Sequence, residues 1–349
     1  MKTNRYDRRS VLGMLAATAA AVGPMTAPRL AYAEDRDATI AAAKRESGLV
    51  WYDHYDQKAS RDLMLAFKKA YPFVKQVEFV DVPASQKQAK VVQESMAGGP
   101  TTDVIFSGPQ DLKSLYDRNL LLSADWKALG VQTSDVMTPE TYMILVTTAV
   151  TVVLYNTNMV KPDDVPHTWE EAFAAKWKGR IGHWSRTVTF LELIPALGEA
   201  KVEAMVQQLA SLRPRLFGGL YPVAEAVASG EIAQAEAAYD DYIRIHAKGA
   251  PVGMAVIEPL PFAQIYGGVL KYGKNPNTAR LFLAWLASPE GAKAFEDQTK
   301  RGNAFVQGTL ASQVVKGHKL SYLPAEQAIA EAKKLTALEA KFSREIAGR

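Results

Sequence analysis

The chain of 349 residues contains no cysteine, which excludes disulfide bonds, zinc–thiolate centres and cysteine nucleophiles. It has only five histidines, and none of them forms an H-E-x-x-H metal motif. The sequence also lacks a G-x-S-x-G turn, a phosphate-binding P-loop and a G-x-G-x-x-G dinucleotide motif. We therefore predict a protein that is not an enzyme, has no cofactor and holds no catalytic metal.

No apolar run is long enough to remain in a membrane, although the first 33 residues resemble an export signal. Arg8 and Arg9 form a twin-arginine pair, an alanine-rich apolar run follows, and Ala31-Tyr32-Ala33 supplies a cleavage pattern. We predict that residues 1–33 are removed after Ala33 and that the mature protein is periplasmic. The twin-arginine route and the general secretory route both remain open.

Neither sign of charge dominates the mature chain. The predicted signal carries five of the 41 basic residues and one of the 37 acidic residues, which leaves 36 of each. The basic balance of the whole chain therefore belongs to the signal, and we expect no nucleic-acid partner. The remaining residues, about 316, contain enough apolar side chains for two lobes without disulfides.

The mature chain alternates apolar strands with amphipathic helices. We expect strands at 49–52, 77–80 and 103–106, with helices at 60–71 and 86–96 between them. This alternation predicts a parallel sheet with helices on both faces.

A β-branched run at 142–155 is longer than an ordinary strand, so it forms either two strands or one strand that crosses between lobes. Gly267-Gly268 is expected to form a turn between two strands, and the chain from Pro324 is expected to be helical.

Several short sequence motifs occur in a fixed order along the mature chain. They are Ala70-Tyr71-Pro72, Ala97 to Val104, Tyr155-Asn156-Thr157, Lys176 to Ile181, Lys274-Asn275-Pro276, Ala279 to Leu286, and Ser288 to Gly291. In this order they resemble the sequence motifs of extracytoplasmic solute-binding proteins of ABC importers. The resemblance is to the group that includes ferric-iron, thiamine and phosphonate binders. The resemblance implies an α/β, two-lobe fold of the type 2 periplasmic-binding-protein kind. Each lobe would be a mainly parallel sheet flanked by helices, with a ligand cleft between the lobes.

The resemblance also implies an arrangement of domains and partners. Residues 34–145 and 257–323 would form the first lobe, residues 146–256 the second lobe, and residues 324–349 a C-terminal helix packed on a lobe. The protein would be a monomer that binds a small polar solute between its lobes and delivers it to a permease in the inner membrane. Two alternatives use the same scaffold: a ligand sensor that presents its bound form to a receptor kinase, and a periplasmic enzyme.

Open α/β sheets bind ligands beyond the carboxyl ends of their strands, so the loops that follow strands are candidate ligand contacts. A hydroxyl, a guanidinium or a helix N-terminus in such a loop suits a carboxylate or phosphate. In their alternative roles, Ser107 and Gly108 only cap a helix, and Arg186 is a surface residue. The candidates are Asp53, His54 and Tyr55, Ser107 and Gly108, and Ser185, Arg186 and Thr187.

The segment Tyr239-Asp240-Asp241-Tyr242 is the most informative candidate site. Ferric binders in the group that the chain resembles carry adjacent tyrosines here, followed by Gly-Ala-Pro. Counting back from Gly249-Ala250-Pro251 places that pair on Asp240 and Asp241, so this chain departs from the iron pattern. We expect the acids to accept a cationic or hydroxyl-bearing solute, and no metal. Two alternatives remain: ferric iron bound through Tyr239 and Tyr242, and acids that only stabilise a helix N-terminus.

Overall fold

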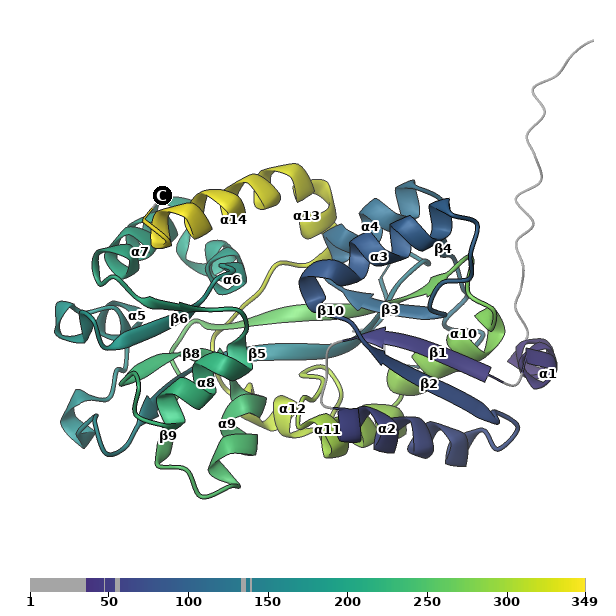
Figure 1. The fold of residues 1–349 in the computed structure, drawn as a ribbon, viewed down its shortest axis with the longest axis horizontal. Helices are drawn as coiled ribbons and strands as arrows, with labels where there is room; N and C mark the ends of the chain where they lie inside the picture. Colours follow the sequence, from purple (N-terminus) through teal and green to yellow (C-terminus); the bar gives the residue numbers. More distant parts are fainter. Residues whose placement is uncertain (1–35, 47, 54–56, 133–135, 139, 349) are drawn as a thin grey trace, which may run out of the picture. The chain divides into compact units, whose positions relative to one another are not determined.

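The structure is a computed structural model that describes residues 36–46, 48–53, 57–132, 136–138 and 140–348 (Figure 1). The predicted export signal and the predicted site residues His54 and Tyr55 lie outside the described residues. Within the described part of the chain, no helix is both long enough and apolar enough to span a membrane.

The first half of the sheet is parallel, as the strand–helix alternation predicts. Strand β1 pairs in parallel with β2 on one side and with β3 on the other. Trp51 of β1 therefore lies between Phe79 of β2 and Val104 of β3. The elements are α1 (Arg36–Glu46), β1 (Gly48–Asp53), α2 (Gln57–Ala70), β2 (Gln76–Asp81), α3 (Ala84–Met96), β3 (Val104–Ser107), α4 (Pro109–Asp117) and β4 (Leu121–Leu122).

The second half repeats this design with a different set of strands. Strand β6 pairs in parallel with β7 and with β8, so their carboxyl ends lie at one edge of the sheet. The elements are α5 (Trp169–Ala172), β6 (Ile181–Trp184), α6 (Val188–Leu197), α7 (Glu199–Ser211), β7 (Arg215–Phe217), α8 (Leu220–Ala228), β8 (Gln234–Ala238), α9 (Tyr239–His246) and β9 (Val252–Ala255), with 3₁₀ turns at Pro162–Asp164 and Ala175–Trp177.

Two long antiparallel strands, β5 (Ile144–Asn156) and β10 (Leu260–Leu270), join the two halves (Figure 1). Strand β10 pairs with β3 and β5 pairs with β8, giving the order β2-β1-β3-β10-β5-β8-β6-β7. The β-branched run is thus one strand that passes from one half to the other, which is one of the two predicted arrangements. The chain ends with α10 (Pro276–Leu286), α11 (Pro289–Thr299), α12 (Leu310–Val314), β11 (Leu320–Ser321), α13 (Ala325–Ala330) and α14 (Ala332–Ile346).

The predicted turn at Gly267-Gly268 is wrong, because both glycines lie inside β10. A Cβ atom on Gly267 would lie 2.5 Å from a methyl group of Leu283 in α10, and one on Gly268 would lie 3.2 Å from Leu121. Glycine within a strand often marks a close approach of another element rather than a turn. The missing side chain of Gly267 lets α10 pack directly onto the strand, and that of Gly268 makes room for Leu121 of β4.

Separate apolar cores support the two halves. The first core surrounds Trp51, whose ring centroid is 5.1 Å from those of Phe79 and Phe106, and it includes Phe282 of α10. The second core contains Phe173 and Phe190. The C-terminal α14 contributes an apolar stripe to this second core, consisting of Leu335, Leu338, Phe342 and Ile346.

Candidate functional site

The predicted site loops of the first half follow β1 and β3, which end at the same edge of the sheet. Asp53 at the end of β1 is buried, and its Oδ1 atom lies 2.8 Å from Nζ of Lys87. Ser107 at the end of β3 donates a hydrogen bond from Oγ to Oδ2 of Asp111, over 2.8 Å. Gly108 is the N-cap residue of α4, which is the alternative role given to it above. These side chains therefore have partners within their own half of the molecule.

The predicted site loop of the second half, Ser185 to Thr187, follows β6 and is held by α14. Arg186 donates from Nε and Nη2 to the carboxylate of Glu339, over 2.7 and 3.1 Å, and its guanidinium lies 5.4 Å from the centroid of the Trp184 ring. Thr187 donates from Oγ1 to the backbone oxygen of Glu339 over 3.2 Å. Ser185 is exposed, and its backbone nitrogen donates to Phe217.

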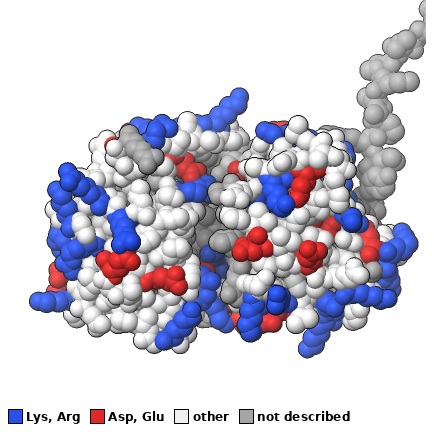
Figure 2. All heavy atoms as spheres, viewed as in Figure 1, with Lys and Arg blue, Asp and Glu red and all other residues white. Residues whose placement is uncertain are grey.

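The loops of the two halves are within electrostatic range of each other. Burial lowers the pKa of Arg186, but the hydrogen bond to Glu339 and its charge more than offset this, so the pKa is raised. Asp111 in the first turn of α4 adds a further rise. Figure 2 shows a furrow between the two halves on the face in view, with Lys and Arg atoms along it.

Tyr239, the first residue of α9, lies in the protein core. Its side chain is fully buried, and its hydroxyl oxygen accepts a hydrogen bond from the backbone nitrogen of Gly302 over 2.8 Å. The same hydroxyl donates to Oε2 of Glu296 over 3.4 Å. Burial, and then the charge of Asp240, raise the pKa of Tyr239 above its ordinary value. Both effects stabilise the neutral phenol of Tyr239 relative to its phenolate.

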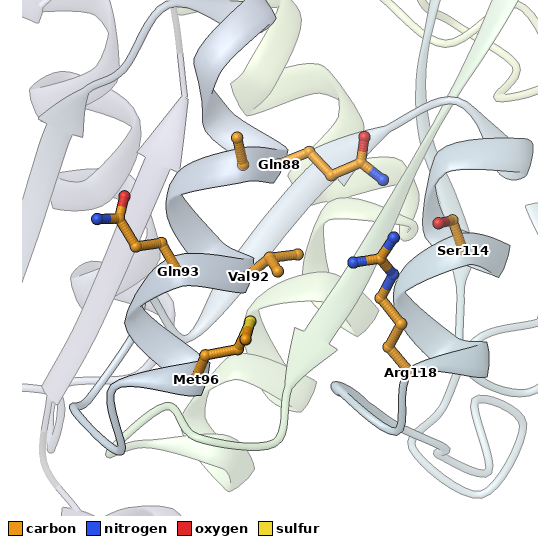
Figure 3. Close-up of a pocket in the computed structure, with 7 residues that line it drawn as sticks. Gln88, Val92, Gln93, Met96, Ser114 and Arg118 are labelled. Atoms are coloured by element: carbon orange, nitrogen blue, oxygen red, sulfur yellow. The ribbon is translucent and has the colours of Figure 1, made fainter.

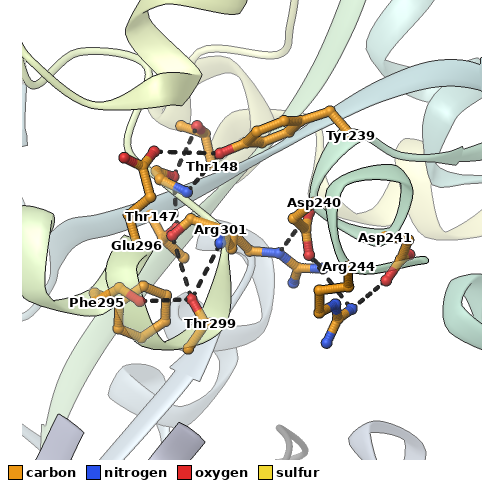
Figure 4. A network of polar contacts seen from close by, with 11 residues as sticks. Thr147, Thr148, Tyr239, Asp240, Asp241, Arg244, Phe295, Glu296, Thr299 and Arg301 are labelled. Carbon is orange, nitrogen blue, oxygen red and sulfur yellow. Dashed lines mark hydrogen bonds and ion pairs between the residues drawn. The ribbon is translucent and has the colours of Figure 1, made fainter. Parts of the chain in front are cut away.

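Asp240 and Asp241 follow in the first turn of α9 and form what we call the Asp–Arg cluster with Arg244 and Arg301 (Figure 4). Arg301 donates to both carboxylate oxygens of Asp240, over 3.3 Å from Nε and 3.2 Å from Nη2. Arg244 donates to Oδ1 of Asp241, and its Nη2 atom lies 3.6 Å from Oδ2 of Asp240. Both Asp side chains are no more than 2% exposed.

Two buried atoms of the Asp–Arg cluster have no hydrogen-bond partner among the described residues: Oδ2 of Asp241 and Nε of Arg244. Burial raises the pKa of Asp241 to about 6, with a further rise from Asp240, while Arg244 and Arg301 lower it. The guanidinium of Arg244 also lies 4.8 Å from the centroid of the Tyr221 ring. The cluster thus offers one buried acceptor and one buried donor to a third group.

The remaining predicted residue of this segment is Tyr242, and three residues near the predicted sites were missed. Tyr242 stacks on His246 with ring centroids 5.1 Å apart. Lys87, Arg244 and Arg301 were not predicted from the sequence. The spacing of Arg244, three and four residues after the two acids on one helix, could have indicated its role. Arg301 is 61 residues from Asp240, and no local pattern connects them.

A separate groove lies between α3 and α4, and no predicted site residue is among those that line it (Figure 3). It has a volume of about 600 Å³ and is lined by Gln88, Ala89, Val92, Gln93, Met96, Ser114 and Arg118. Among the described residues, no group of three or more histidine or acidic side chains could hold a metal ion.

The sequence is similar to that of a known iron-binding protein over part of its length. The major ferric iron-binding protein of Neisseria gonorrhoeae is 30% identical over 158 residues, which is 41% of this chain and 46% of that protein. The match therefore spans less than half of that relative's length.

Two solved structures share the fold over most of both chains. Iron-bound HitA from Pseudomonas aeruginosa has a TM-score of 0.70 at 20% identity, covering 84% of this chain and 99% of HitA. AfuA from Actinobacillus pleuropneumoniae, a periplasmic binding protein with fructose-6-phosphate bound, has a TM-score of 0.69 at 19% identity, covering 86% and 99%. The profile of the bacterial extracellular solute-binding protein family matches residues 62–316. The chain belongs to the bacterial extracellular solute-binding protein family.

Proposed function

We propose that this protein is the exported solute-binding component of an ABC importer. In this role it captures one small polar solute between its halves and delivers it to a membrane permease, as a monomer and without chemical change. Family membership supports the proposal, as do two parallel half-sheets joined by antiparallel strands β5 and β10. Rotation about such connections lets two lobes close on a ligand. Removal of residues 1–33 after Ala33 and the lobe boundaries at 145/146 and 256/257 belong to the same proposal.

The solute is an organic molecule with a cationic or hydroxyl donor group. The observation that carries this assignment is Oδ2 of Asp241, a buried carboxylate oxygen without a hydrogen-bond partner among the described residues. A buried acceptor left unpaired costs free energy, and a donor on the solute removes that cost. The unpaired Nε of Arg244 nearby suits an acceptor on the same solute.

Ferric iron is the second candidate, because the curated relative with the 158-residue match is named a ferric iron-binding protein. The placement of Tyr239 opposes it in this chain. A ferric site built on this segment needs a phenolate, whereas the hydroxyl of Tyr239 is engaged by Gly302 and Glu296 in the core. The neighbouring carboxylates are already paired with Arg301 and Arg244. Two cations within the cluster also disfavour a third cation of high charge.

Thermal melting of the mature chain against a panel of solutes tests the proposal. The panel contains ferric citrate, thiamine, primary amines and polyamines, phosphonates, and aliphatic and aromatic acids. A solute at one hundred times its dissociation constant should add about 2.7 kcal/mol to the free energy of unfolding. We expect amine-bearing organic solutes to raise the melting temperature. A rise with ferric iron alone would contradict the organic assignment.

The Asp241→Asn variant then locates the solute. Loss of a charge-assisted hydrogen bond should weaken binding about tenfold to hundredfold, measured by isothermal titration calorimetry. Asp297→Asn is the matched control, because the carboxylate of Asp297 is half-exposed on α11 and its ion pair among the described residues is with Lys293. Equal affinities of the Asp241→Asn variant and the unmodified protein would place the solute elsewhere.

A further inference from the structure

We propose that Arg301 is a positioning residue that sets the charge of the solute the site accepts. By neutralising Asp240 it leaves Asp241 as the carboxylate of the Asp–Arg cluster that has an oxygen without a partner among the described residues, so the site takes a single cationic group rather than two. This inference rests on the proposed function, and it assigns to Arg301 a role that acts through Asp240.

The contact between Arg301 and Asp240 has the geometry of a dedicated pair. The guanidinium donates from Nε and Nη2 to the two carboxylate oxygens, which is the paired arrangement that arginine forms with carboxylates. The side chain of Asp240 is 2% exposed and that of Arg301 is 17% exposed. A carboxylate buried to this degree needs a paired cation to remain ionised.

Hydrogen bonds hold the backbone on both sides of Arg301, in the polar network that Figure 4 shows. The nitrogen of Arg301 donates to Oγ1 of Thr299, over 3.1 Å. The nitrogen of Gly302 donates to the Tyr239 hydroxyl, and the oxygen of Gly302 accepts from Oγ1 of Thr147 over 2.7 Å. The turn is therefore tied to α9 and to β5, on either side of the pair that it supports.

Asp240 and Asp241 differ in how many of their carboxylate oxygens have hydrogen-bond partners. Asp240 receives two hydrogen bonds from Arg301 and has Nη2 of Arg244 at 3.6 Å. Asp241 receives a hydrogen bond from Arg244 at Oδ1, while its Oδ2 has no partner among the described residues. Without Arg301, two adjacent buried carboxylates would share one guanidinium. A solute with two cationic groups would then fit better than a solute with one.

Because of the same geometry, the pKa of Asp241 depends on the charge of Arg301. Its charged neighbours are Asp240 and Arg244 on α9 and Arg301 after α11, while Tyr221 of α8 lies against Arg244. Asp240 raises the pKa of Asp241, and the two arginines lower it. Replacing Arg301 by a neutral residue should therefore raise the pKa of Asp241 further. A residue remote from Asp241 that only stabilised the fold would leave this pKa unchanged.

The experiment compares Arg301→Gln and Arg301→Lys with the unmodified chain, using butylamine and 1,4-diaminobutane as matched probes. We expect the unmodified protein and Arg301→Lys to favour the monoamine. In Arg301→Gln the ratio of the two dissociation constants should move at least tenfold towards the diamine. Arg215→Gln is the control, because it removes an arginine from an exposed pair with Glu231. An unchanged ratio in Arg301→Gln overturns the inference.

A second readout needs no solute. The pKa of Asp241, followed by carboxyl-carbon NMR, should be higher in Arg301→Gln than in the unmodified protein, and a lower or unchanged value overturns the inference. If Arg301→Gln does not fold, Asp240→Asn should lower the pKa of Asp241 and keep the monoamine preference, and the opposite result overturns the inference. If the NMR shift appears but neither amine binds the unmodified protein, the proposed solute class fails rather than the role of Arg301 in controlling Asp241.

Discussion

Glu192 in α6 provides the strongest test of the energetics of this fold. Its carboxyl group is buried, with the residue only 8% exposed. Its Oε2 atom accepts a hydrogen bond from the backbone nitrogen of Leu323 over 2.6 Å, and its backbone oxygen accepts one from Ser321 Oγ. Burial raises the pKa of Glu192 to about 8, although the hydrogen bond from Leu323 lowers it. We predict that Glu192→Gln makes the protein more stable at alkaline pH.

The direction of the stability change with pH follows from the raised pKa of Glu192. The stabilising contribution of the protonated acid is fully present below the ordinary pKa of 4.5 and is lost as the pH rises to about 8, because the unfolded chain ionises first. Each pH unit in this window costs about 1.4 kcal/mol, so between pH 5 and pH 8 the unmodified protein should lose about 4 kcal/mol relative to the variant. Glutamine is neutral at both values and keeps an oxygen for Leu323.

Urea unfolding at half-unit steps from pH 5 to pH 9 measures this difference. The gap between the variant and the unmodified protein should be smallest at pH 5, grow to pH 8 and then stay constant. For a chain of this size, about 4 kcal/mol corresponds to roughly 8 °C in melting temperature. Glu203→Gln serves as a control, because Glu203 is a partly exposed residue of α7 that pairs with Lys341. A gap that does not change with pH would refute a buried, protonated Glu192.

Two further substitutions test the turn that holds Arg301. Gly302→Ala should destabilise the protein by about 1–3 kcal/mol, because its Cβ atom would overlap the carboxylate of Glu296. Gly218→Ala is the control: its Cβ atom would meet nothing within 4 Å, so the substitution should have little effect on the denaturation midpoint. Tyr239→Phe should cost about 1–3 kcal/mol in the same assay, because it removes the acceptor of the buried Gly302 nitrogen. Ferric citrate should give no tyrosinate absorption band with the unmodified protein, and a band that disappears in Tyr239→Phe would contradict the core position of Tyr239.

Much of the fold could be predicted because apolar runs and helix breakers are local signals. The helix Arg36–Glu46 was not predicted, since most of it is polar and only Thr39 and Ala43 are buried. Its function in the fold is also non-local. Glu46 accepts hydrogen bonds from the backbone nitrogens of Asn277 and Thr278 and so supplies the N-terminal cap of α10, over 200 residues away. No pattern within a single segment carries that information.

The candidate site was predictable only in part, for a similar reason. The position of Asp240 and Asp241 at the start of a helix follows from the strand that precedes them and from the preference of acids for a helix N-terminus. Which partner each acid has depends on the turn at Arg301, which reaches α9 only in the folded chain. The burial of Tyr239 likewise depends on Gly302 and Glu296, which come from the segment around α11.

The two apolar cores have a consequence for how the chain is made. The first core is closed by Phe282 and Phe295, and the second by Leu338 and Phe342, so each core needs residues from the end of the sequence. During synthesis, neither half can bury its apolar surface fully until the ribosome has nearly finished. The halves should therefore mature together and late rather than one after the other. In that interval the incomplete chain exposes surface that chaperones and proteases recognise.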